Sequence, residues 1–195
     1  MSMSKRDYII QKCFECFVKN GIEGTTTRDF CAEADINANT LYYYFSSKND
    51  ILVECVNYGF AQLENALFDA LKEFDKSSFD IFPHLAKIVM DHAPQMRFLH
   101  QAVSSPAFEK YRENQFKKVN AFYDRLGREL AKRFEVPYDL IKDYIFDIMT
   151  LLSYYTLWGS QEMAAIQFNR IFTDFKNAIL TSRRLKEGLS NEEEN

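Results

Sequence analysis

The chain has 195 residues, a formal net charge of -4 and a hydrophobic share of 47%, enough apolar side chain for one or two compact domains. Only 6 glycines and 4 prolines occur, too few for the many turns of a β-sandwich or barrel, so the composition favours long helices. The acidic balance excludes a strongly basic, histone-like binder of nucleic acids.

Two helices are predicted at the start of the chain. Residues 6–20 have apolar side chains at helical spacing and end at Gly21, a residue type that stops helices. Thr26 and Asp29 form a capping box, which predicts that a second helix starts there and ends near Asp35.

A third and a fourth helix follow at once. Asn37 is a residue type that caps helix N-termini, so a short helix is expected from there to about Tyr44. Ser47 and Asp50 form a second capping box, and apolar residues then recur at helical spacing as far as Leu71.

The four prolines divide the rest of the chain, because proline is favoured in the first turn of a helix and breaks its interior. We therefore expect helices near residues 79–92, 94–102, 106–134, 137–159 and 161–186. The last nine residues, 187–195, are acidic and are expected to be disordered.

The cysteines suggest small core residues more than a metal site. Cys13 and Cys16 have the spacing of a CxxC motif, but they lie in a helical apolar pattern and Cys31 and Cys55 form no second pair. We expect reduced, buried thiols, with no metal and no cofactor. No signal peptide and no stretch that could span a bilayer is evident, which predicts a cytoplasmic protein without membrane contact.

The second and third helices have the spacing of a helix-turn-helix motif, with Ile36 filling the gap and Leu41 and Phe45 as anchors. The exposed face of the third helix is rich in hydrogen-bonding groups and poor in charge, which suits the major groove of duplex DNA. That face carries Asn37, Ala38, Thr40, Tyr42, Tyr43 and Tyr44.

Residues 21–52 are similar to the signature of a known family. They read GIEGTTTRDFCAEADINANTLYYYFSSKNDIL. This run closely resembles the signature of the TetR family of transcriptional regulators. The resemblance implies an all-α protein in which a three-helix DNA-binding domain (residues 1–47) precedes a helical domain for ligand binding and dimerisation (residues 48–186). It also implies a homodimeric repressor that a small-molecule effector releases from operator DNA.

Two positions depart from the signature. Asp35 stands where the family has a turn glycine, and aspartate is one of the least penalised residues in the left-handed conformation. Asn39 replaces a glycine at the start of the recognition helix, and its side chain is able to pair with adenine.

The resemblance implies phosphate contacts from Thr26, Thr27, Tyr42 and Tyr44. Lys48 is a further candidate, because the first turn of a helix gains nothing electrostatically from a cation.

The effector and dimer sites are predicted in the second domain. Residues 79–159 are rich in aromatic side chains, and the polar groups expected to line a pocket are His100, Tyr111, Tyr123 and Tyr155. The family dimerises through its last two helices, so the apolar stripe of Phe168, Phe172, Phe175 and Ile179 is the expected interface.

Two other functions stay open. The first is an enzyme. The sequence has no phosphate-binding glycine loop, no GxSxG and no HExxH motif, so the catalytic residues of an enzyme would follow none of these motifs. A helical interaction module without DNA binding is also compatible with residues 1–50, whose six basic residues are balanced by seven acidic ones.

Overall fold

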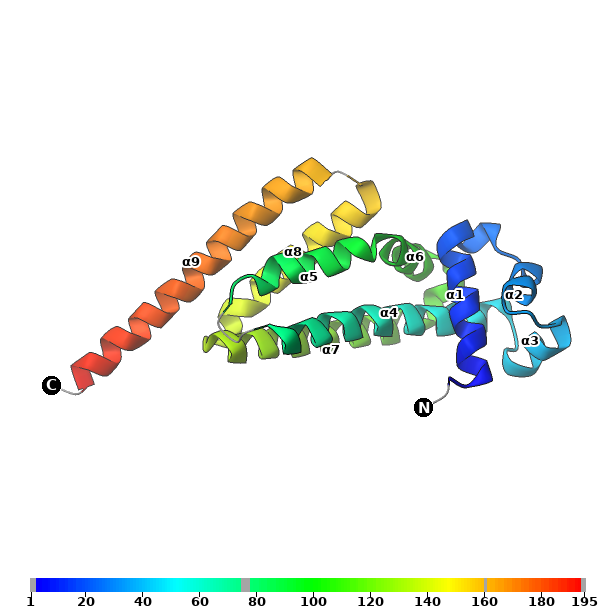
Figure 1. The fold of residues 1–195 in the computed structure, drawn as a ribbon, viewed down its shortest axis with the longest axis horizontal. Helices are drawn as coiled ribbons and strands as arrows, with labels where there is room; N and C mark the ends of the chain where they lie inside the picture. The colour runs from blue at the N-terminus through cyan, green and yellow to red at the C-terminus, as the bar shows by residue number, and fades with distance from the viewer. Residues whose placement is uncertain (1–2, 75–77, 160, 194–195) are drawn as a thin grey trace. The chain divides into compact units, whose positions relative to one another are not determined.

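The computed structural model describes residues 3–74, 78–159 and 161–193, and within these ranges it contains helices and no strand (Figure 1). The helices are α1 (Lys5–Gly24), α2 (Thr27–Glu33), α3 (Ala38–Tyr44), α4 (Lys48–Glu73), α5 (Ile81–Asp91), α6 (Ala93–Ser104), α7 (Glu109–Phe134), α8 (Tyr138–Trp158) and α9 (Gln161–Glu193), with a short 3-10 turn, η1 (Pro106–Phe108), before α7. The predicted all-α class is confirmed. No helix in the described ranges is long and apolar enough to cross a membrane.

The chain divides into two compact units. Unit 1 comprises Met1–Ala66 and His92–Gln115, and unit 2 comprises Leu67–Asp91 and Phe116–Asn195. Both α4 and α7 therefore supply residues to both units. This structural division differs from the expected functional boundary between residues 47 and 48, which stays a prediction.

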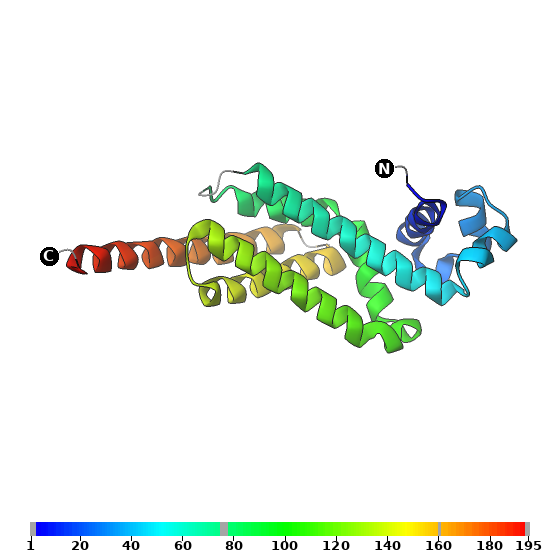
Figure 2. The same ribbon diagram turned by 90° about the horizontal axis from the view of Figure 1, so that it is seen from below.

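The core of unit 1 explains why α6 joins the first helices. The ring of Phe98 on α6 stacks on Phe17 at 5.5 Å between centroids and meets the edge of Phe14 at the same distance. Phe17 in turn packs against Phe30 of α2 at 5.0 Å. The two contacts of Phe98 join residues more than eighty positions apart in the sequence. Figure 2 shows α1, α2 and α3 grouped around one another.

In unit 2, α8 and α9 lie side by side in opposite directions (Figure 1). Phe82 of α5 packs its ring against the edge of Phe175 at 4.6 Å, and Tyr144 of α8 packs on the same ring at 4.9 Å. Phe175 and Ile179 are both 0% exposed within a single chain. The prediction that these two residues form the dimer interface is therefore wrong, because they already form the core of their own chain.

The end of the chain also differs from expectation. Helix α9 continues to Glu193 instead of ending near residue 186, so most of the acidic segment 187–195 is helical. The segment has no proline, and its leucine and glutamates are good helix formers that outweigh one glycine. Residues 194 and 195 lie outside the described residues.

Cationic side chains satisfy carbonyl oxygens at two helix C-termini of unit 2. Arg133 donates to the carbonyl oxygens of Leu71 and Phe74 at the end of α4. Arg183 of α9 donates to Phe134 at 3.1 Å, and Lys186 donates to Glu135 at 2.6 Å, at the end of α7. A cation at this end of a helix is favoured by the helix dipole, so these contacts stabilise the ends of both helices.

Candidate DNA-binding site

Helix α2 begins with the capping box that the sequence predicts. The backbone N–H of Asp29 donates to Thr26 Oγ1 at 3.3 Å, and the backbone N–H of Thr26 donates to Asp29 Oδ2 at 2.7 Å. The Thr26 hydroxyl also donates to Asp29 Oδ2 at 2.7 Å, and these bonds lower the pKa of the Asp29 carboxyl. Both donors of Thr26 are thus engaged within the box, so of the two threonines Thr27 is the better placed to reach a phosphate.

The turn between α2 and α3 depends on Asp35. Its φ is 50°, in the left-handed region, as expected for a residue in place of the family's glycine. The N–H of Ile36 donates to the Cys31 carbonyl at 3.0 Å, and the N–H of Asp35 donates to that of Ala32 at 3.4 Å. These are the bonds of a Schellman-type helix end, so the turn forms without glycine.

Helix α3 is held by two buried anchors and one cap. Leu41 and Phe45 are buried, which confirms their predicted role. The Asn37 side-chain oxygen accepts from the backbone N–H of Thr40 at 2.9 Å and from its hydroxyl at 3.1 Å. Asn37 is therefore the N-cap, and its NH₂ group supplies the donors that remain for DNA.

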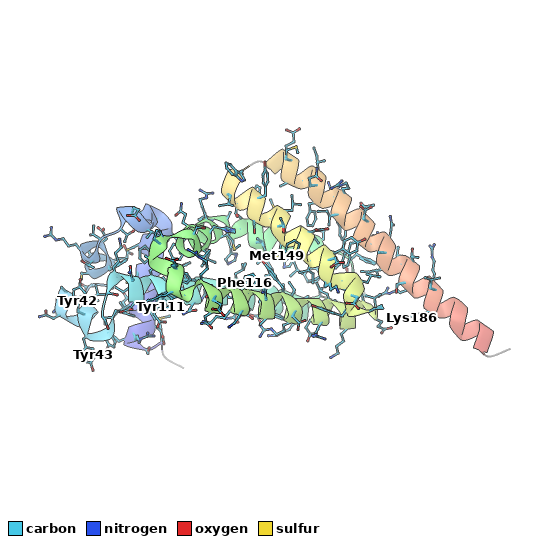
Figure 3. All side chains as sticks on the ribbon, turned by 180° about the vertical axis from the view of Figure 1, so that it is seen from behind. Tyr42, Tyr43, Tyr111, Phe116, Met149 and Lys186 are labelled. Atoms are coloured by element: carbon cyan, nitrogen blue, oxygen red, sulfur yellow. The ribbon has the colours of Figure 1, made fainter. Side chains whose placement is uncertain are left out.

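The outer face of α3 presents the other predicted residues. Tyr42 is 51% exposed and Tyr43 is 82% exposed, and both project from α3 in Figure 3. Ala38 and Asn39 are also exposed, whereas Thr40 and Tyr44 are half-buried. The Asn39 amide has no partner among the described residues, so its donor and its acceptor are both available to a base.

Lys48, the first residue of α4, lies beside the start of α2. Its ammonium group donates to the Ile22 carbonyl at 2.8 Å, and its positive charge contributes to the lowered pKa of Asp29. The structure thus brings Lys48 close to the helix start that carries Thr27.

Arg28 is a candidate for phosphate contact that the sequence analysis does not name. It is exposed and follows Thr27 in the first turn of α2. The signal was available, because a cation in the first turn gains nothing from the helix dipole, as at Lys48.

The four predicted effector residues are not among those that line the cavity of unit 2. Unit 2 holds a small, partly open cavity of about 40 Å³, lined by twelve apolar side chains from α4, α5, α7, α8 and α9, including Met149, labelled in Figure 3. None of His100, Tyr111, Tyr123 and Tyr155 lines it, and the first two belong to unit 1. These four residues are predicted as polar pocket groups, whereas every side chain in the wall of this cavity is apolar.

The cysteines behave as core residues. Cys13, Cys16 and Cys55 are buried and Cys31 is half-buried. Burial raises the pKa of the Cys13 thiol to about 12 and also raises those of Cys16 and Cys55. In the part of the chain that the structure describes, no group of three or more His, Cys, Asp or Glu is placed to hold a metal ion.

Known proteins similar to the chain agree with this geometry. Residues 9–55 match the model of the bacterial regulatory proteins of the tetR family. The chain is 25% identical over 111 residues to a probable HTH-type transcriptional regulator, YttP of Bacillus subtilis, and the match spans 53% of each protein.

Solved structures share the fold over most of the chain. A putative transcriptional regulator from Rhodococcus sp. RHA1 has 16% identity and a TM-score of 0.71, covering 90% of this chain and 98% of that one. The multidrug binding protein EbrR, solved with imidazole, has 17% identity and a TM-score of 0.57, covering 89% and 96%. Together with the helix-turn-helix geometry, these matches identify a tetR-type DNA-binding domain at residues 9–55, in a chain that shares the all-helical fold of solved transcriptional regulators.

Proposed function

We propose that the chain is a repressor that binds operator DNA as a homodimer and is released when a small molecule binds in unit 2. The exposed, uncharged face of α3, held on a capped helix-turn-helix, is the observation that carries the proposal. The similarity of residues 9–55 to bacterial regulatory proteins supports action in the cytoplasm, where bacterial DNA lies.

The residues divide into two kinds of DNA contact. Asn39, Tyr43 and the Asn37 NH₂ group lie at the start or on the outer face of α3, the part of a recognition helix that reaches base edges. Thr27 and Lys48 lie at the starts of α2 and α4, where phosphate contacts set the register on the duplex without reading sequence. Among the tyrosines of α3, Tyr42 is the further phosphate candidate.

The proposed dimer interface lies on the outer face of α8 and α9. The large hydrophobic side chains exposed on these two helices are Phe146, Tyr154, Leu157, Trp158, Met163 and Ile166. Polar and charged side chains lie among them, namely Asp147, Thr150, Gln167 and Arg170. A shallow hollow of about 470 Å³ between the two helices would receive side chains of the partner. Exposed aromatic and aliphatic side chains gathered on two neighbouring helices are typical of a protein interface, and a second copy would also supply the second recognition helix.

The effector site is proposed for the cavity of unit 2. The solved relative EbrR is named a multidrug binding protein, which supports a ligand site in this fold. Helix α4 carries Lys48 at its start and Leu67 of the cavity wall near its end, so it is one covalent path along which occupancy of the cavity could alter the DNA-binding helices. Release then requires that the effector bind the DNA-free state more tightly than the DNA-bound state.

To test DNA binding, a duplex is selected from a random library with the full chain. The selected duplex is then titrated with the full chain at several salt concentrations. A regulator should prefer the selected duplex to a scrambled one, with affinity that falls steeply as salt rises. A helical interaction module without a DNA role would show neither the preference nor the salt dependence.

A further inference from the structure

The cavity of unit 2 has no polar side chain in its wall. Twelve side chains form the wall, and all of them are apolar. Ten are aliphatic, including Leu67, Leu126 and Met149, and the other two are phenylalanines, one of which is Phe168 of α9. A charged group placed there would lose its hydration without gaining a partner, which is strongly unfavourable. At about 40 Å³ the cavity is far smaller than the roughly 150 Å³ of an apolar cavity that binds benzene.

A groove of about 310 Å³ adjoins this cavity on the surface of unit 2, between α5, α8 and α9. Ala86, Leu152 and Phe168 line both spaces, so these three side chains form the partition between them. Phe168 is half-buried, and its ring stacks on Phe172 at 6.0 Å. Of the three, Phe168 has the largest side chain, and rotation of its ring would open the partition most.

The rim of the groove offers weak polarity and no unpaired charge. Its polar side chains are Lys87 and Asn169. The Lys87 ammonium group lies 2.6 Å from Asp91 Oδ2, so its charge is already paired. An uncharged carbonyl group could accept from either residue, whereas a carboxylate would have to share Lys87 with Asp91.

We propose, resting on the effector site proposed above, that the ligand is an uncharged molecule with a linear alkyl chain. The tip of the alkyl chain occupies the small cavity, the rest of the ligand lies in the groove, and the Phe168 ring turns aside to let the alkyl chain pass. An alkyl chain is proposed because the cavity of about 40 Å³ is too small for a ring such as benzene, whereas the adjoining groove of about 310 Å³ has room for the rest of the molecule. Lack of charge follows from the apolar wall of the cavity.

The test uses the full chain with three probes that share an eight-carbon chain: 1-octanol, octanoate and octyltrimethylammonium. Calorimetry should show saturable binding of 1-octanol and at least tenfold weaker binding of the two charged probes. Equal or tighter binding of a charged probe, or no binding of 1-octanol, would overturn the proposal.

Two substitutions of alanine by valine test where the ligand binds. Ala86→Val narrows the partition and should weaken 1-octanol binding at least tenfold. Ala131→Val is the matched control, because Ala131 is equally buried, at 6% exposed, and lines neither space. If Ala86→Val does not fold, Phe168→Ala decides, since opening the partition should speed or tighten binding. An unchanged affinity in a folded Ala86→Val protein, or unchanged rate and affinity in Phe168→Ala, contradicts the assignment.

DNA binding measured in the same samples separates this inference from the proposed function. Binding of 1-octanol that leaves operator affinity unchanged would support the ligand class and overturn release by this site. Release of DNA by a charged or bulky molecule, with 1-octanol inactive, would keep the repressor and overturn the alkyl ligand.

Discussion

The ammonium group of Lys48 donates a hydrogen bond to the carbonyl oxygen of Ile22 at 2.8 Å, which joins the first residue of α4 to the last turn of α1. An ammonium group has three donors, so two remain for a phosphate oxygen. The bond holds the lysine beside the start of α2, where Thr27 and Arg28 are the other candidates for phosphate contact. Lys48 thus fixes local geometry and can also contribute charge to the site.

Lys48→Ala should weaken binding to selected and scrambled duplexes alike, because phosphate contacts carry no direct sequence information. The slope of log affinity against log salt should fall in magnitude by about 1 per subunit. Lys72→Ala is the matched control, since Lys72 is an exposed lysine in the last turn of the same helix. Equal effects of the two variants in a fluorescence anisotropy titration would remove Lys48 from the site.

Glycine in place of the two described non-glycine residues with positive φ should stabilise the fold. Asp35 and Glu135 have φ values of 50° and 55°, where a side chain costs roughly 1–2 kcal/mol relative to glycine in the least favourable cases. Asp35→Gly should raise the unfolding free energy by up to about 1 kcal/mol, and Glu135→Gly by at least as much, because aspartate tolerates the conformation better than glutamate. Chemical denaturation of both variants measures this, and a loss of stability in both would contradict the account.

Charge on the outer face of α8 should dissociate the dimer. Phe146 is 64% exposed, so Phe146→Glu should fold and sediment as a monomer at concentrations where the parent protein is dimeric. Phe175→Glu should instead unfold unit 2, because Phe175 is fully buried and a lone buried charge is strongly destabilising. A dimeric Phe146→Glu protein would show that the interface lies elsewhere.

His100 should make unit 1 sensitive to mild acid. Its Nε2 atom is buried with no hydrogen-bond partner among the described residues, and burial lowers the pKa of the imidazole below its usual 6.5. The unfolded chain therefore binds the proton more readily, so stability present above pH 6.5 is lost as the pH falls below that value. His100→Leu should flatten the melting temperature between pH 7 and pH 5.5, and a profile identical to the parent's would assign the acid sensitivity to other groups.

Features set by neighbouring residues could be predicted from the sequence. Three such features are the Thr26–Asp29 capping box, the Asn37 N-cap and the left-handed Asp35. Each depends only on residues within five positions, so each can be predicted from a short stretch of sequence. Phe175 and Ile179 were misplaced because periodicity shows that a helix has an apolar face but not what covers that face. Periodicity also does not reveal that Phe98 packs on α1 and so joins α6 to unit 1. Nor does it reveal the aliphatic cavity, because that cavity is formed where side chains of five helices meet.

The most direct test of the central claim, that α3 reads operator DNA, is a titration of Asn39→Ala against the selected duplex and variants of it at each base pair. A bidentate pair between asparagine and adenine contributes about 1–3 kcal/mol of discrimination. Asn39→Ala should therefore lose preference at one base pair in each half-site and keep the parent's salt slope, in contrast to Lys48→Ala. Equal loss of affinity for every duplex, or no loss for any, would contradict the account, since α3 would then not present Asn39 to a base.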